Sequence, residues 1–102
     1  MSDDDLNRLA RWFARHCDGE WEQHRGVSVQ STDNPGWWVK IDLERTELAG
    51  RPFAAVCEGV DDRGFPTSGR WLHCRLKDGL WHGAGDQTRL AEIISRFLAW
   101  AG

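Results

Sequence analysis

The pattern of apolar and polar positions predicts a helix at each end of the chain. In the first segment, apolar residues recur at helical spacing, and Gly19 follows as a natural stop. This stripe consists of Leu6, Leu9, Ala10, Phe13 and Cys17. In the last segment, Asp86 is the expected N-cap of a second amphipathic helix. Its stripe consists of Leu90, Ile93, Ile94, Phe97, Leu98 and either Trp100 or Ala101. Each helix therefore offers one apolar side to a core.

The segments between these helices alternate with the period of strands. Val27 and Val29 alternate with polar residues, and residues 37–43 do the same over a longer stretch. There, one face carries Trp37, Val39, Ile41 and Leu43, and the other carries Trp38, Lys40 and Asp42. Residues 53–57 form a third, less regular candidate. These patterns predict antiparallel strands that are buried on one side only.

Three turn signals connect the elements. Asp78-Gly79, between residues 70–77 and 80–84, strongly favours a two-residue hairpin. In that register Leu76 pairs with Trp81 and Arg75 with His82, which puts Leu72, Cys74, Leu76 and Trp81 on the core face. Residues 34–37 fit a type II turn with Gly36 at its third position. Residues 83–85 are expected to form a simple turn before Asp86, and residues 61–69 form a loop.

Together these elements predict an α+β fold. We expect an antiparallel sheet of about five strands, with the N-terminal and C-terminal helices packed on one face. The length of 102 residues fits one domain, spanning residues 1–102. Each helix has one apolar stripe and the sheet has one apolar face, so the layers can cover one another.

Tryptophan is the unusual feature of the composition, with seven Trp and no Tyr. The helix faces and the core side of the strands account for Trp12, Trp37, Trp81 and Trp100. Trp38 and Trp71 are left on the polar side of their strands. One interpretation is that a loop covers them, either 59–69 with Phe65 and Pro66 or the N-terminal connection. The other is that they belong to a protein-binding surface, where Trp is enriched.

Acidic residues gather in the middle of the sequence. Residues 42–62 contain six acids against the two basic residues Arg45 and Arg51. We expect these acids to surround the two tryptophans on a partner-binding surface, which then consists of Trp38, Asp42, Glu44, Glu47, Glu58, Asp61, Asp62 and Trp71. The net charge of −3 makes nucleic acid an unlikely partner.

The sequence offers no convincing catalytic or metal-binding group. Three cysteines without close spacing, Cys17, Cys57 and Cys74, are expected to be buried free thiols. His73 and His82 share one strand face, but the neighbouring Arg75 makes a poor environment for a cation. The glycine-rich segment before Asp86 lacks the lysine of a phosphate-binding loop. We therefore expect a non-enzymatic protein without a metal or cofactor.

The termini and hydropathy bear on where the protein acts. No apolar run is long enough to cross a membrane, and residues 1–5 are acidic where a secretory signal would be basic. We expect a cytoplasmic protein with no membrane partner.

Several short motifs resemble those of the immunity protein 53 (Imm53) family of bacterial polymorphic toxin systems. The first helix ends in Cys17-Asp18-Gly19 and is followed by Trp21-Glu22. Then comes a turn made of Asp33, Asn34, Pro35, Gly36 and Trp37. The later Trp71-x-x-Cys74, the segment 83–85 and the closing Phe97-x-x-Trp100 extend the similarity over nearly the whole chain. Trp38 departs from the pattern, because a smaller or polar residue is expected after Gly36-Trp37.

The resemblance implies an immunity protein that binds and neutralises a cognate toxin domain. An acidic surface would suit the basic cleft of a nuclease-type toxin. The alternative is a module that binds a small ligand or nucleic acid with the Trp-bearing sheet face. The two family motifs are open to structural and binding roles alike: Asp33 and Asn34 could bond to their own turn, and Glu22 could accept from a backbone amide, pair with an arginine or contact a partner.

Overall fold

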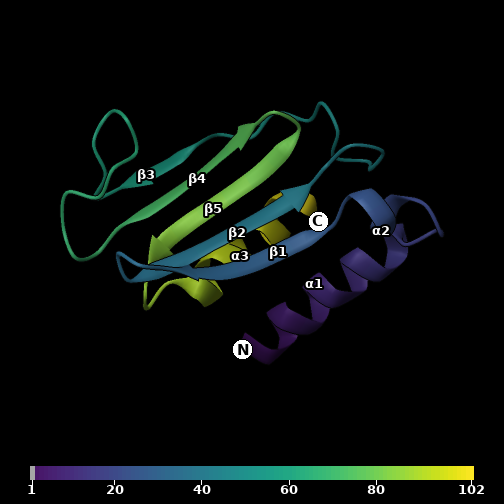
Figure 1. The fold of residues 1–102 in the computed structure, drawn as a ribbon, viewed down its shortest axis with the longest axis horizontal. Coiled ribbons are helices and arrows are strands. Elements are labelled where there is room, and N and C mark those ends of the chain that lie inside the picture. Colours follow the sequence, from purple (N-terminus) through teal and green to yellow (C-terminus); the bar gives the residue numbers. More distant parts are fainter. Residues whose placement is uncertain (1) are drawn as a thin grey trace.

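A five-stranded antiparallel sheet with helices at both ends of the chain forms the fold, as the sequence predicts (Figure 1). The structure is a computed structural model that describes the backbone of residues 2–102 and the side chains of residues 5–102. Its elements are α1 (Ser2–His16), α2 (Trp21–His24), β1 (Val27–Thr32), β2 (Gly36–Asp42), β3 (Val56–Glu58), β4 (Leu72–Lys77), β5 (Leu80–Asp86) and α3 (Leu90–Ala101). None of the helices in the described part of the chain is long and apolar enough to span a bilayer.

The strands lie in the order β1-β2-β5-β4-β3, and every neighbouring pair is antiparallel. The predicted hairpin register is confirmed, with Leu76 opposite Trp81 and Arg75 opposite His82. Asp78 and Gly79 have φ angles of 56° and 77°, as a type I′ turn requires at both positions. Leu76, expected in the core, is 37% exposed because it lies at the hairpin end of β4, beyond the cover of α3.

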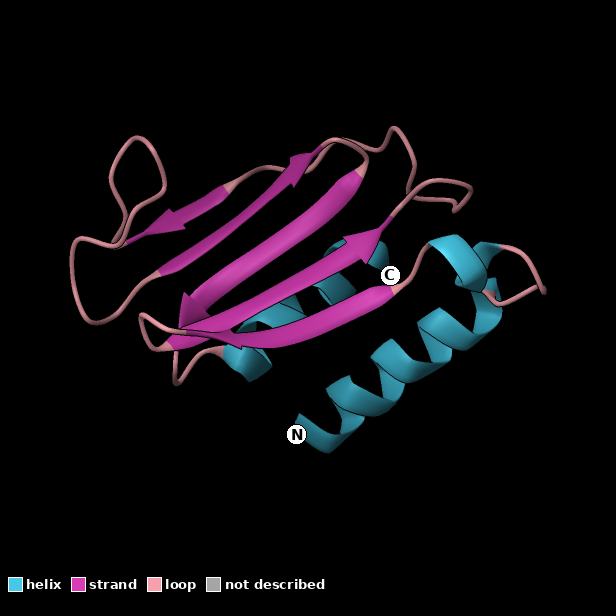
Figure 2. Ribbon diagram, in the orientation of Figure 1, coloured by secondary structure: helices cyan, strands magenta, loops and turns pink. Residues whose placement is uncertain are grey.

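The two faces of the sheet have different neighbours. Helix α3 lies under β2 and β5, and α1 packs against α3 (Figure 1). Figure 2 shows that the opposite face carries no helix. We call this face, with the side chains of Trp38, Lys40, His73, Arg75, Lys77, His82 and Ala84, the open face. The alternation of apolar and polar residues in β2 explains why the helices cover one face only, because its apolar residues Val39 and Ile41 point to the helix side and are fully buried there.

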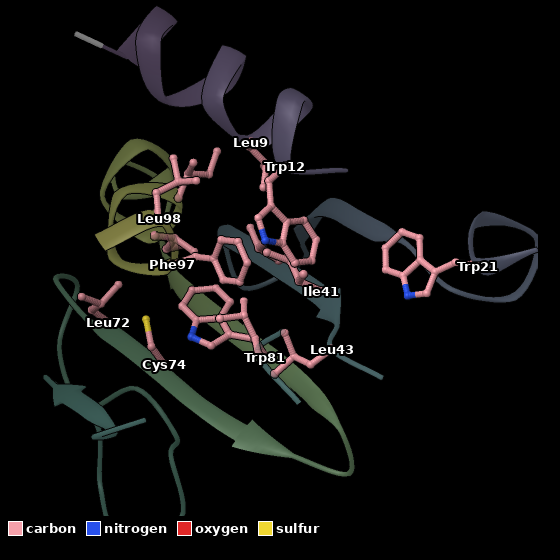
Figure 3. Packing of buried hydrophobic residues seen from close by; sticks show 14 residues of the cluster. Leu9, Trp12, Trp21, Ile41, Leu43, Leu72, Cys74, Trp81, Phe97 and Leu98 are labelled. Atoms are coloured by element: carbon pink, nitrogen blue, oxygen red, sulfur yellow. The ribbon is translucent and has the colours of Figure 1, made fainter. Parts of the chain in front are cut away.

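Large aromatic rings fill the core between sheet and helices (Figure 3). Trp81 on β5 meets Phe97 on α3 edge to face, with ring centroids 5.3 Å apart. Trp12 on α1 contacts Phe97 at 5.1 Å and Trp21 at 6.1 Å. Trp12, Trp21 and Trp81 are each no more than 2% exposed. These rings join α1 and α2 to α3 and the sheet in one apolar cluster.

The buried side of α1 differs from the predicted stripe. Leu9 and Trp12 are buried and Phe13 is partly buried, whereas Leu6 is 52% exposed. Ala10 and Cys17 are also exposed. Because α1 packs on the helix α3 rather than on the sheet, a narrow ridge of apolar side chains is enough to fill the contact between the two helices. That ridge is centred on Trp12, one position away from the predicted stripe.

The segment before α3 is strand, not turn. β5 continues through Gly83, Ala84 and Gly85 to Asp86, and α3 begins only at Leu90. Asp86 is therefore not the N-cap of α3, whose cap position is held by Arg89 without a side-chain bond. Glycines occur here because α3 crosses β5 closely: a Cβ on Gly83 would lie 2.5 Å from Ile93 Cγ2 and from Trp81 Cζ3.

Replacement of Gly83 by alanine is expected to lower the free energy of unfolding by about 1–3 kcal/mol, because the added methyl overpacks the contact with α3. Gly69→Ala is the matched control, since a Cβ there meets nothing within 4 Å. That control should change stability by less than about 0.5 kcal/mol in urea titrations. Equal effects of the two substitutions would contradict the close crossing.

Two further expectations are corrected. Gly36 does not occupy a type II turn; it is the first residue of β2 and pairs with Thr32. The third strand covers Val56–Glu58 rather than 53–57. Phe53 turns away from the sheet plane into the aromatic core, with its ring 5.8 Å from Trp81 and 5.3 Å from Trp100. Tertiary aromatic contacts thus decide where this strand begins.

Candidate functional site

Trp38 and Trp71, which are 33 positions apart in the sequence, line the same depression on the open face. The depression has a volume of ≈ 250 Å³. It lies between β2, β5 and β4 on one side and the loop formed by residues 59–69 on the other. Its lining consists of Thr32, Trp38, Arg63, Gly64, Phe65, Trp71, His73, Arg75, His82 and Ala84.

Trp38 forms the β2 wall of the depression. Its ring stacks on His82 of the neighbouring strand β5, with centroids 6.0 Å apart and an interplanar angle of 24°. Trp38 Nε1 donates a hydrogen bond to His82 Nδ1 at 3.3 Å. Lys40 Nζ lies 4.7 Å from the centroid of the indole ring, a cation–π contact. These contacts hold a half-buried indole in a fixed orientation.

Trp71 is held through its backbone. It directly precedes β4, and its N–H donates to Asp86 Oδ2 at 2.9 Å. The neighbouring Gly36 provides room for the indole: a Cβ at that position would lie 3.2 Å from Trp71 Cζ2. Asp86 also accepts from the Thr88 N–H at 2.9 Å and from the Thr88 hydroxyl at 2.6 Å. The buried Asp86 carboxylate therefore positions Trp71 as well as the turn that leads into α3.

The loop of residues 59–69 closes one side of the depression. Asp61 Oδ1 accepts hydrogen bonds from the backbone N–H groups of Arg63 and Phe65, each at 2.9 Å. Gly64 has a φ of 85° and lies against the His73 ring, where a Cβ would be 2.6 Å from Cε1. Phe65 remains 58% exposed. The loop thus borders the two tryptophans, as one interpretation of the sequence expected, without covering them completely.

The charged groups of the depression are basic. Arg63 and Arg75 carry fixed positive charges, and none of the described lining residues is acidic. Burial lowers the pKa of His73 and of His82, and the nearby Arg75 guanidinium lowers both further. His82 Nδ1 accepts the bond from Trp38 and so carries no proton. The two histidines are therefore neutral at neutral pH, and the arginines provide the charge.

The acidic candidates do not gather around the tryptophans. Asp42 Oδ2 accepts the Gly26 N–H at 2.9 Å, at the end of β2 that is far from the 59–69 loop (Figure 1). Near the same end, Glu44 pairs with Arg25 at 2.7 Å and Glu47 with His16 at 2.7 Å. These acids are engaged with neighbouring backbone, guanidinium or imidazole groups.

The remaining three acids lie toward the other end of the sheet. Glu58 faces α3, where it lies 3.3 Å from Arg89 and 3.5 Å from Arg96. Asp61 and Asp62 belong to the 59–69 loop, beside the depression, and Asp61 is bonded to its own loop. Of the six acidic candidates, Asp42, Asp61 and Asp62 therefore lie on or next to the open face.

The Trp21-Glu22 motif is part of the short helix α2. Trp21 is buried, and its Nε1 donates to the Glu44 carbonyl at 2.8 Å. Glu22 accepts the backbone N–H groups of Asp18 and Gly19, each at 2.9 Å. Trp21 thus ties the connection between α1 and β1 to the segment after β2, and Glu22 holds the loop between α1 and α2. Backbone amides were one of the alternatives for Glu22.

The second motif forms the β1–β2 turn. Asp33, Asn34 and Pro35 are exposed there, and the Thr32 hydroxyl donates to the Asn34 carbonyl at 3.4 Å. The expected bonds from Asp33 and Asn34 side chains to their turn are not found within residues 5–102, because Thr32 takes this role. Trp37 is half-buried on the helix side, and its Nε1 donates to the Gln87 carbonyl at 3.1 Å.

The cysteines differ from expectation in two places. Cys74 is buried, and burial raises the pKa of its thiol to about 12. Cys17 and Cys57 are exposed, because α1 ends before Cys17 and β3 is an edge strand whose Cys57 points to the open face. Local desolvation and the carboxylates of Glu22 and Asp18 raise the pKa of Cys17, which disfavours its thiolate.

Sequence reasoning missed Arg63 as part of the lining of the depression. The hairpin register already placed His73, Arg75 and His82 on one face with Trp71. Arg63 gave no such signal, since it lies in a loop whose position depends on tertiary contacts, whereas Phe65 was already a candidate to cover the tryptophans. The site therefore combines strand residues that follow from alternation with loop residues that do not.

Comparison with known proteins gives one match. No curated protein sequence and no solved structure matches this chain. The sequence profile of a family described as immunity protein 53 matches residues 6–102, which is nearly the whole chain and includes both tryptophans of the depression. The chain belongs to the immunity protein 53 (Imm53) family.

Proposed function

We propose that this protein acts in the bacterial cytoplasm as the immunity partner of a polymorphic toxin, and that it binds the toxin domain with its open face. Family membership supports a toxin protein as the partner. The choice of the open face rests on one observation: Trp38 and Trp71 lie half-buried and oriented around a depression on a sheet face without a helix.

A fixed aromatic pair is well suited to this task. Trp is enriched among the residues that dominate binding energy, and it loses little conformational entropy on binding. Stacking on His82 and the Lys40 contact already restrict Trp38, while the Asp86 bond restricts Trp71. The protein therefore presents this surface with little rearrangement to make on association.

The acidic residues take a smaller part in the proposal. Asp42, Asp61 and Asp62 are retained as the rim of the binding surface, whereas Glu44, Glu47 and Glu58 form ion pairs within the protein. The expectation of a nuclease-type toxin rested on an acidic surface. Since the centre of the open face combines aromatic with basic side chains, its composition favours a toxin surface that presents acidic groups.

Binding of the toxin domain encoded by the neighbouring gene tests the proposal. With an inactivated toxin domain, we expect wild-type protein to form a complex at submicromolar concentration. Trp38→Ala and Trp71→Ala should each weaken binding by about 2 kcal/mol, or roughly 30-fold, as expected for central interface tryptophans. Calorimetric titration gives these affinities, and co-expression with active toxin gives the matching loss of protection.

Leu6→Ala is the matched control, because Leu6 is an exposed apolar residue on α1 away from the open face. It should leave the affinity within about twofold of the wild type. Thermal unfolding of each variant checks that the loss is not caused by unfolding. No complex at micromolar concentration would refute the proposed function, and unchanged affinity of both Trp variants would place the interface elsewhere.

A nucleic-acid-binding module is the second candidate, because Lys40, Arg63, Arg75 and Lys77 accompany the two tryptophans. Titration of Trp fluorescence with single-stranded oligonucleotides separates the two. The immunity function predicts saturable quenching by the toxin domain and none by oligonucleotides at physiological salt.

A further inference from the structure

We propose that the depression between Trp38 and Trp71 receives an acidic side chain of the partner protein, bound by Arg63 and Arg75. This inference rests on the proposed function, because it assigns the chemistry of the toxin surface that the open face binds.

Charge is the first argument. Arg25, Arg89 and Arg96 each lie within 3.5 Å of a carboxylate of the same chain. In the described residues 5–102, no carboxylate lies within this distance of Arg63 or Arg75; this is true of several other arginines, but of these only Arg63 and Arg75 line the depression. Asp61 and Asp62 lie beside the depression, but the two guanidinium groups together with Lys40 and Lys77 outnumber them, which leaves an excess of positive charge that a partner's carboxylate would neutralise.

The donors in the depression are the second argument. A guanidinium offers several N–H donors that match the geometry of a carboxylate. The neutral His73 and His82 rings add donor capacity on the floor of the site without adding charge. Trp38 and Trp71 form apolar walls, which shield such a charged contact from water and strengthen it.

The shape of the site is the third argument, and it disfavours a stacked nucleobase. Trp38 already has Lys40 near its ring and His82 stacked against it, so its π surface is partly used within the protein. The volume of ≈ 250 Å³ accommodates a side chain and lies below the range of about 300–1,000 Å³ typical of small-molecule pockets. A protein side chain therefore fits the observations better than a nucleotide.

Charge reversal at Arg75 tests the inference. Arg75 is exposed, so Arg75→Glu is compatible with folding, and Arg63→Gln provides a second, milder variant in the loop. Arg11→Glu is the matched control, because it makes the same change in net charge on the exposed surface of α1, where Arg11 lines a groove together with Arg8 and Arg15. Affinity for the inactivated toxin domain is measured at two salt concentrations by calorimetry.

We expect Arg75→Glu to weaken binding at least about tenfold and Arg63→Gln to weaken it measurably, while Arg11→Glu stays within about twofold. Added salt should weaken the wild-type complex more than the Arg75→Glu complex. Suppose that wild type binds and Trp38→Ala weakens the complex, but Arg75→Glu has the same affinity as Arg11→Glu. Binding of an acidic side chain in the depression is then refuted, and the proposed function stands. If wild type does not bind the toxin domain, both fail; Arg75-dependent binding of an oligonucleotide in that case assigns the depression to nucleic acid.

Discussion

Replacement of Trp81 by alanine is expected to lower the free energy of unfolding by about 3–5 kcal/mol, because it removes one of the largest side chains of the core. Trp81 is fully buried on β5, between Phe97 at 5.3 Å and Phe53 at 5.8 Å. Alanine would leave a cavity at the junction of the sheet, α3 and the 53–55 segment. Urea titration followed by circular dichroism measures the loss, which is a large part of the roughly 5–15 kcal/mol of a domain.

Trp81→Phe separates the packing from the polar contribution of this residue. Trp81 Nε1 is buried and has no hydrogen-bond partner among the described residues. A buried donor without a partner costs about 1–3 kcal/mol of stability. Phenylalanine removes this donor and keeps most of the aromatic ring. We therefore expect Trp81→Phe to cost less than about 1.5 kcal/mol. Equal losses for Trp81→Phe and Trp81→Ala would contradict the account of this core.

Asp86→Asn is expected to cost about 2–4 kcal/mol at neutral pH, because it disrupts a buried, charged acceptor. Oδ1 accepts two bonds from Thr88 and Oδ2 accepts the Trp71 N–H. An asparagine has only one side-chain oxygen, so its amide N–H₂ would face one of these donors. Because Asp86 holds Trp71, the same substitution should also weaken toxin binding.

The Asp86 contribution should depend on pH. The hydrogen bond from the Thr88 hydroxyl, together with those from the backbone of Thr88 and Trp71 and the charge of Arg89, lowers the pKa of Asp86 to about 2, against an ordinary 3.8. A folded-state pKa below the unfolded value adds stability above pH 3.8, and this stability is lost as the pH falls toward 2. The stability difference between wild type and Asp86→Asn should therefore shrink over that range.

Glu92→Gln is the control for the Asp86 measurements. Glu92 also pairs with Arg89, at 2.8 Å, but its side chain is 38% exposed. Such a surface ion pair contributes about 0–1 kcal/mol. If Glu92→Gln lost as much stability as Asp86→Asn, the role assigned to the Asp86 carboxylate would be contradicted. The same holds if the stability difference between wild type and Asp86→Asn stayed constant between about pH 5 and pH 2.

Local sequence rules predicted the parts of the fold that depend on nearby residues. The Asp78-Gly79 turn sets the register of β4 and β5, because few residues adopt the two positive φ angles that it requires. The alternation in β2 likewise predicts which side of the sheet is buried. The prediction of a turn at residues 83–85 was wrong. The glycines there resemble the composition of a turn, but they occur because α3 passes close to the strand.

The site was predictable only in part, for a related reason. Alternation left Trp38 and Trp71 on the polar side of the sheet, and the structure brings both to one depression. Sequence proximity suggested that the acids of residues 42–62 surround them. The fold separates these acids because the end of β2 and the 59–69 loop lie at different ends of the sheet, and most of the acids find partners of their own. Pairing across the fold cannot be inferred from spacing along the chain.

The most direct test of the proposed interface is amide hydrogen exchange of the protein with and without the inactivated toxin domain. The 59–69 loop borders the depression, and the adjacent turn of residues 33–35 follows Thr32 in its lining. We predict that the complex slows exchange in both segments, while exchange in α1 stays as in the free protein. Slowed exchange in α1, with none in residues 59–69, would contradict binding through the open face.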